Sequence, residues 1–205
     1  MKRPSFRVVF GAALVAVLVV VAGGAEWIAP YDPTAQALAE NLAPPGADHL
    51  LGQDKLGRDI LTRVIYGTRV SLAVGLVTVS ISLLIGTVIG ALAGFAGGWI
   101  DELVMRAVDV LLAFPGLLLA IALTGVLGPS LRNVVIALCL IGWTGYARLA
   151  RGEIARLRER AIVEAARALG VPETRILARH LLPLLATPLL VQATFGMAAT
   201  IVAEA

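Results

Sequence analysis

Several residue types that build enzymatic and metal sites are scarce in this 205-residue chain. It has one cysteine, Cys139, so it can form neither a disulfide framework nor a cysteine metal cluster. Its two histidines, His49 and His180, are too few and too far apart in sequence to indicate a metal site. The phosphate-binding pattern G-x-x-x-x-G-K-[ST] does not occur, and no spacing of Ser, Cys, His or carboxylate residues indicates a catalytic set. We therefore expect no catalytic residues, no bound cofactor or metal, and no ATP hydrolysis by this chain itself.

Charged residues are also scarce, and much of the chain consists of long apolar runs. Charged residues make up 15% of the chain, against about a quarter in soluble domains, and the mean hydropathy is +0.88. A helix needs about 20 mostly apolar residues to cross the hydrocarbon core of a membrane. The segments that meet or approach this length are Val8–Ala25, Val70–Ile100, Val110–Leu131, Asn133–Ala147 and Leu181–Ala203. The sequence thus predicts an all-α, polytopic membrane protein with about five transmembrane helices.

Two polar segments indicate the orientation of these spans in the cell membrane. Residues 30–69 are rich in Pro and Gly and nearly neutral, which is typical of an irregular loop. Residues 148–183 carry eight arginines against four glutamates. Basic segments favour the cytoplasmic side, so residues 148–183 and the N-terminus, with Lys2, Arg3 and Arg7, are expected there. The first apolar run has a second interpretation, a cleaved signal peptide.

The arginine-rich segment has the pattern of two helices joined by a glycine turn. Apolar residues recur at helical spacing along its first half, which predicts one continuous helix. This stripe consists of Ile154, Leu157, Ala161, Ala165 and Ala168. Gly170 suits the left-handed position after a helix, and Pro172 and Glu173 suit the first turn of the next one. A corner near Leu169 and Gly170 is therefore expected to protrude.

These residues alone leave open what the corner contacts. A basic amphipathic hairpin can lie on anionic lipid, and the same hairpin can dock on another protein. A DNA-binding helix-turn-helix is a weaker alternative, because the chain is tethered to a membrane and glutamates are interspersed with the arginines. We therefore expect no nucleic-acid partner.

Three sequence blocks resemble those of a known family. Glu164-Ala165-Ala166, followed by Gly170 and by Leu182-Pro183, resembles the EAA loop of ABC importer permease subunits. The general pattern has isoleucine at the position of His180. A histidine at this position resembles the peptide and nickel branch of that family. The other two blocks are His49–Asp59 with Arg63, Tyr66-Gly67 and Arg69–Leu72, and Arg106 with Asp109 and Phe114-Pro115. The blocks follow the order of that branch and cover most of the chain.

This resemblance implies the type I ABC importer permease fold and a transmembrane subunit that imports di- or oligopeptides, with nickel or another small solute as the alternative. It implies as partners a second permease subunit, two cytoplasmic ABC ATPase subunits and an extracytoplasmic substrate-binding protein. The implied ATPase-coupling residues are Glu164, Ala165, Ala166, Gly170, Leu182 and Pro183. The alternative from another class is a membrane-anchored interaction protein whose basic hairpin binds membrane lipid.

The resemblance also suggests how the chain is organised. Residues 1–69 are expected to form an N-terminal region with the first span and an extracytoplasmic loop. Residues 70–205 are expected to form the transporter membrane domain, with the coupling loop at 148–183. The family normally has a sixth span, so the chain is expected to be a fragment or a truncated product.

Some local patterns carry further predictions. One glycine face consists of Gly86, Gly90, Gly94 and Gly98. Its four-residue spacing favours close helix packing within the chain over a pore-lining or intersubunit face. Asp109 is expected to pair with Arg106, one turn earlier. Phe114-Pro115 and Leu182-Pro183 predict helix kinks, and Gly128-Pro129 predicts a hairpin turn.

Overall fold

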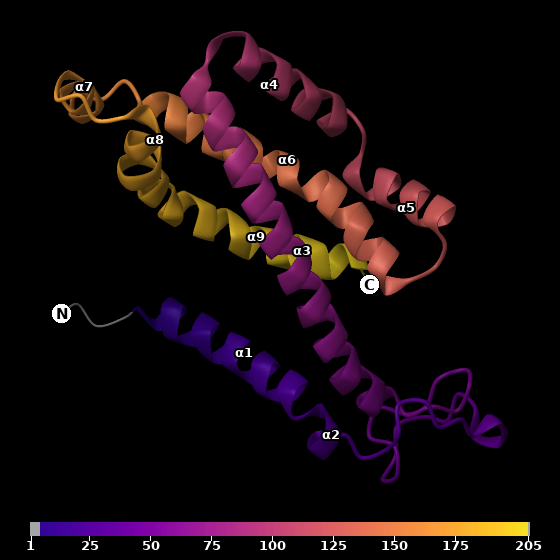
Figure 1. Cartoon of the computed structure of the whole chain (residues 1–205). Helices are drawn as coiled ribbons and strands as arrows, with labels where there is room; N and C mark the ends of the chain where they lie inside the picture. The colour runs from indigo at the N-terminus through magenta and orange to yellow at the C-terminus, as the bar shows by residue number, and fades with distance from the viewer. Residues whose placement is uncertain (1–4, 205) are drawn as a thin grey trace. The chain divides into compact units, whose positions relative to one another are not determined.

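The computed structural model describes residues 5–204, so Lys2 and Arg3 of the expected basic N-terminus lie outside the described residues. Figure 1 shows the order of the helices. They are α1 (Phe6–Gly23), α2 (Ala25–Ile28), α3 (Ile60–Ala96), α4 (Gly98–Leu112), α5 (Gly116–Leu127), α6 (Leu131–Leu157), α7 (Ala161–Ala168), α8 (Glu173–Arg175) and α9 (Ala186–Glu204). Short 3-10 or π turns lie at η1 (Leu38–Glu40), η2 (Ile176–Leu181) and η3 (Leu182–Leu185). The chain divides into two compact units between Ala73 and Val74, within α3.

Within the described part of the chain, four helices are long and apolar enough to cross a membrane, or five if one bent pair counts as a span. The four are α1, α3, α6 and the helical run Glu173–Glu204, and the bent pair is α4 with α5. The predicted all-α, polytopic membrane fold is confirmed. Two helices are longer than the apolar spans predicted within them, because α3 begins at Ile60, before Val70, and α6 continues to Leu157, past Ala147. Hydropathy marks the apolar part of a helix, and these helices continue into polar sequence.

The third predicted span, Val110–Leu131, is not one straight helix. The axes of α4 and α5 differ by 81° at a break before Gly116. The bend between the two helices can be followed in Figure 1. Pro115 lacks a backbone N–H and disfavours helical geometry at Phe114, which explains the break. The kink predicted at this proline is therefore confirmed. The predicted turn at Gly128-Pro129 also occurs, between α5 and α6.

Gly97 and Gly98 make the turn between α3 and α4, with φ of 66° and 58°. Glycine adopts such left-handed conformations readily because it has no β-carbon. Residues 101–106 follow this turn as part of α4.

The predicted pair of Arg106 with Asp109 does not form. Arg106 pairs with Glu102 one turn back, at 2.7 Å, and Asp109 pairs with Arg148 of α6. The side chain of Asp109 finds a cation on the packed neighbouring helix, which the spacing within α4 does not indicate.

The backbones of α3 and α6 approach each other closely along the glycine face. A β-carbon added at Gly94 would lie 2.6 Å from the carbonyl oxygen of Arg151, and those at Gly86 and Gly90 would lie still closer to α6 carbonyl oxygens. The predicted packing role is therefore confirmed for these three glycines. Gly98 lies beyond the end of α3 in open space, so it does not belong to the face.

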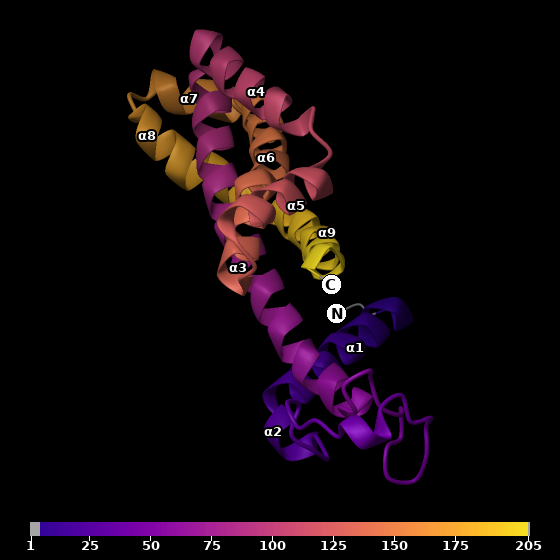
Figure 2. The same cartoon turned by 90° about the vertical axis from the view of Figure 1, so that its right-hand side faces the viewer.

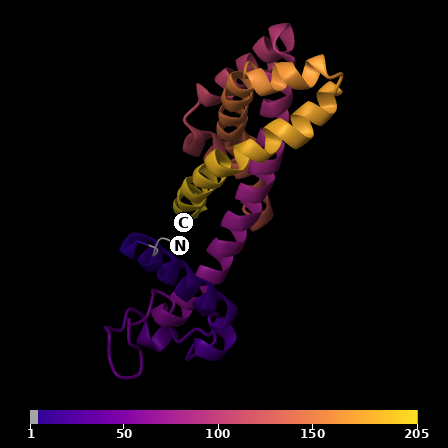
Figure 3. The same ribbon diagram turned by 90° about the vertical axis from the view of Figure 1, so that its left-hand side faces the viewer.

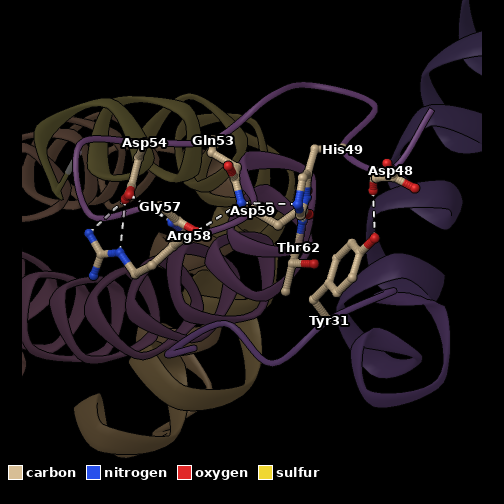
Figure 4. A network of polar contacts seen from close by, with 9 residues as sticks. All are labelled: Tyr31, Asp48, His49, Gln53, Asp54, Gly57, Arg58, Asp59 and Thr62. Carbon is tan, nitrogen blue, oxygen red and sulfur yellow. Dashed lines mark hydrogen bonds and ion pairs between the residues drawn. The ribbon is translucent and has the colours of Figure 1, made fainter. Parts of the chain in front are cut away.

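The loop before α3 has little regular secondary structure but is tied together by polar contacts, as Figure 4 shows. The Oδ2 atom of Asp59 accepts from the N–H of Thr62 at 2.7 Å, which caps the start of α3, and its Oδ1 atom lies 2.9 Å from Nδ1 of His49. The amide of Gln53 lies 3.0 Å from Nε2 of His49 and donates to the carbonyl of Gly57 at 3.1 Å. Burial raises the pKa of Asp59, but the hydrogen bonds from Thr62 and His49 outweigh it and leave that pKa below its usual value.

Asp59→Ala is expected to loosen the start of α3, because it removes both the cap and the partner of His49. Caps of this kind contribute about 1–2 kcal/mol. Because the pKa of Asp59 is lowered in the folded chain, its contribution is present above a pH of 3.8 and is lost as the pH falls through the folded value. Hydrogen exchange of the amides of residues 52–62 should be faster in the variant at neutral pH.

The matched control is Asp32→Ala, because Asp32 accepts from Thr34 within its own turn. The control should leave exchange at residues 52–62 unchanged. Equal protection of these amides in Asp59→Ala and the natural chain would contradict the capping role.

Candidate coupling surface

The arginine-rich segment forms a hairpin, seen in Figure 3 as an orange arm followed by a yellow one. The helix α6 ends at Leu157, Arg160 is extended (φ −78°, ψ 144°), and α7 starts at Ala161. The prediction of one continuous helix is therefore wrong. Of the predicted stripe, the two members in α6 are buried and the three in α7 are exposed. The three residues between the helices change the helical phase, so a different face of α7 meets the core.

The turn after α7 forms as predicted. Gly170 has φ of 74° and its N–H donates to the carbonyl of Arg167 at 2.9 Å. The N–H of Val171 donates to the carbonyl of Ala166 at 3.0 Å, so the two bonds form a Schellman motif. The guanidinium of Arg167 donates to both carboxylate oxygens of Glu173, at 2.7 and 3.2 Å, which raises the pKa of Arg167. These contacts hold the two arms of the hairpin at a defined angle.

The inner face of α7 belongs to the main core of the second unit. Val163 is 1% exposed and Ala166 is 9% exposed. They share this apolar cluster with Ile154 and Leu157 of α6, and with buried residues of η2 and η3. Ala166, one of the predicted coupling residues, thus lies against the core, where its small side chain lets α7 approach.

The outer face of α7 carries two large apolar residues that motif reasoning missed. Ile162 is 65% exposed and Leu169 is 83% exposed. Ala165 is exposed between them at helical spacing, and Glu164 is exposed beside it. An apolar pair seven residues apart was visible in the sequence, but its significance depends on the helical phase after residue 160.

The remaining predicted residues lie elsewhere on the hairpin. Leu182 is half-buried and packs against the core cluster, and Pro183 is exposed within η3. The helical path leaves α geometry here through the π turn η2 and the 3-10 turn η3, yet Glu173–Glu204 remains one helical run, so the kink predicted at Leu182-Pro183 stays a prediction. The structure thus places Glu164, Ala165 and Gly170 at one exposed corner, and Leu182 and Pro183 on the approach to α9.

Comparison with known proteins identifies this chain. The family model of the binding-protein-dependent transport system inner membrane component matches residues 86–205, which include the whole hairpin. The chain belongs to this family. Residues 7–45 of this permease match a second family model, the N-terminal TM domain of oligopeptide transport permease C.

The relatives of this permease are named as subunits of transport systems. It is 44% identical to a dipeptide transport system permease protein of Alkalihalophilus pseudofirmus over 167 residues, which are 82% of this chain and 55% of the relative. It is 43% identical to a putative peptide transport system permease protein of Brucella suis over 208 residues, which cover 100% of this chain and 68% of the relative. It is 42% identical to a glutathione transport system permease protein of Pectobacterium atrosepticum over 170 residues, which are 82% of this chain and 56% of the relative. The chain therefore spans between 55% and 68% of these relatives' lengths.

Proposed function

We propose that this chain is the transmembrane permease subunit of an ATP-driven importer of di- or oligopeptides. The observation that carries the proposal is the exposed corner of α7, an apolar and acidic surface on a helix whose opposite face is locked into the core. Family membership supports the transport role, and the peptide and glutathione names of its relatives favour peptides as the substrate class.

In this proposal the corner docks in a groove of an ABC ATPase. Ile162 and Leu169 supply apolar anchors, and Ala165 lets the groove approach the helix backbone. Glu164 pairs with a cation on the ATPase, and Gly170 sets the angle of the corner. A rigid docking element transmits force better than a flexible loop, and this hairpin has both a packed face and a closed turn.

The proposed assembly has a second permease subunit beside this chain, two cytoplasmic ATPase subunits and an extracytoplasmic substrate-binding protein. The partner ATPases hydrolyse ATP, and this chain supplies half of the path through the cell membrane. The proposed coupling loop, residues 148–183, faces the cytoplasm together with the N-terminus. Residues 1–69 then form an N-terminal region with an extracytoplasmic loop, and residues 70–205 form the transport domain.

Leu169→Asp and Glu164→Lys test the docking role. Each is expected to lower association with the partner ATPases at least about tenfold, which corresponds to ~1.4 kcal/mol. Leu169→Asp places an unpaired charge in an apolar groove, and Glu164→Lys sets two positive charges against each other. Co-purification in detergent, followed by titration of the ATPase, measures the change.

Thr174→Asp is the matched control, since Thr174 is exposed on the second arm of the same hairpin. It should leave ATPase association within twofold. The competing function, lipid binding by the hairpin, predicts another pattern. If the hairpin binds lipid instead, Leu169→Asp would weaken its binding to anionic vesicles, and this binding would depend on salt. ATPase association would then be unchanged, which would refute the coupling proposal.

A further inference from the structure

An arginine at the end of α6 holds the last turn of α3. Nη1 of Arg158 donates to the carbonyl oxygens of Gly94 and Phe95, at 3.1 Å each. The last carbonyls of a helix have no partner within it, and a cation there also interacts favourably with the helix dipole. A β-carbon added at Gly97 would lie 2.6 Å from Nη1 of Arg158, so the glycine turn leaves room for the guanidinium. Figure 2 shows the ends of α3 and α6 at the same end of the unit as the start of α4.

A second arginine, two turns earlier in α6, holds the first turn of α4. Nε of Arg151 donates to both carboxylate oxygens of Asp101, at 2.8 and 3.0 Å, and its Nη2 donates as well. The Asp101 side chain is only 13% exposed, so removal of Arg151 would leave a nearly buried charge without its partner. Together, Arg158 and Arg151 attach the end of α6 to both sides of the Gly97-Gly98 turn.

The end of α6 is in turn bound to α7 by the apolar core. Ile154 and Leu157 of α6 are 0% and 3% exposed and belong to the same cluster as Val163 and Ala166 of α7. Close-packed interiors transmit displacement rather than absorb it. Movement of α7 therefore moves the end of α6, and with it the two arginines.

We infer that Arg158 and Arg151 are positioning residues that carry movement of the coupling hairpin to the α3–α4 turn. From that turn the movement passes along α4, which ends at the bend before Pro115. This inference rests on the proposed function, because it assumes that an ATPase moves α7. It adds a route from α7 into the membrane helices that runs through neither α8 nor α9.

The test uses the complete transporter in proteoliposomes and measures the ATP hydrolysed per peptide imported. Arg158→Ala and Arg151→Ala are expected to raise this ratio about tenfold, while ATPase association stays within twofold because the outer face of α7 is untouched. Arg158→Lys should raise it less, since lysine keeps the charge but cannot reach two carbonyls with one planar group. Arg156→Ala is the matched control, because Arg156 lies on the same segment, is 61% exposed and pairs with Glu153.

Exchanging the two charges of the Asp101–Arg151 pair distinguishes loss of this contact from failure of a variant to fold. Asp101→Arg and Arg151→Asp should each raise the ratio, and the double variant should bring it back toward the natural value. An unchanged ratio in Arg158→Ala and Arg151→Ala, or no recovery in the double variant, would overturn the inference. Failure of the proposed function gives a different result, because the natural chain would then not associate with the ATPases.

Discussion

Gly90→Val is expected to prevent α3 and α6 from packing and to abolish recovery of the folded membrane unit. The β-carbon alone would overlap the carbonyl oxygen of Ala147, which belongs to the backbone of α6 and cannot rotate away. Overpacked cores typically lose about 1–3 kcal/mol when side chains can adjust, and here the helices themselves must separate. The loss should therefore exceed that range.

Thermal unfolding and size-exclusion chromatography in detergent would measure the effect. The matched control is Gly67→Val in the same helix, because an added β-carbon at Gly67 meets nothing within 4 Å. This control corrects for the change in helix propensity from glycine to valine, which both variants share. If Gly90→Val were as stable as Gly67→Val, the close approach of the two helices would be refuted.

Gly170→Pro is expected to destroy the proposed coupling corner, Glu164–Gly170, while leaving the membrane helices intact. Proline requires φ near −65°, whereas Gly170 has φ of 74°, and proline also lacks the N–H that donates to Arg167. These two losses cost about 3 kcal/mol or more, which is enough to reorganise a surface turn. ATPase association and peptide uptake should both fall at least tenfold.

A graded series separates turn geometry from simple replacement of glycine. Gly170→Asn should behave nearly as the natural chain, because asparagine tolerates the left-handed region, and Gly170→Ala should be intermediate at about 1 kcal/mol. Normal helix content by circular dichroism would show that the membrane helices remain. Undiminished ATPase association in Gly170→Pro would show that the turn does not shape the docking surface.

The features predicted correctly depend on short stretches of sequence. Apolar runs mark the membrane helices because lipid demands about 20 such residues whatever surrounds them. Gly170 and Pro115 act on the backbone within one turn of themselves, so the corner and the α4–α5 break could both be predicted. The glycine face was predictable because its spacing is local, although its partner helix was not.

The features that were missed depend on residues far apart in the chain. Asp101 and Arg151 are separated by 50 positions, and nothing near either residue identifies the other. Asp109 was assigned to Arg106 by spacing, but it pairs with Arg148 of the packed neighbouring helix. Ion pairs between helices require the helix register, which sequence periodicity does not contain.

Composition and turn residues were thus enough to predict a polytopic membrane protein with a glycine-turned hairpin, because hydropathy and turn chemistry act locally. The resemblance of its motifs to a known family added that it is a permease. Packing was needed to establish which face of α7 is exposed. The three-residue break after Leu157 resets the helical phase, and burial of Val163 and Ala166 in the core then turns Ile162 and Leu169 outward. That choice is made by apolar contacts between α7 and distant segments, so it exists only once the chain has folded.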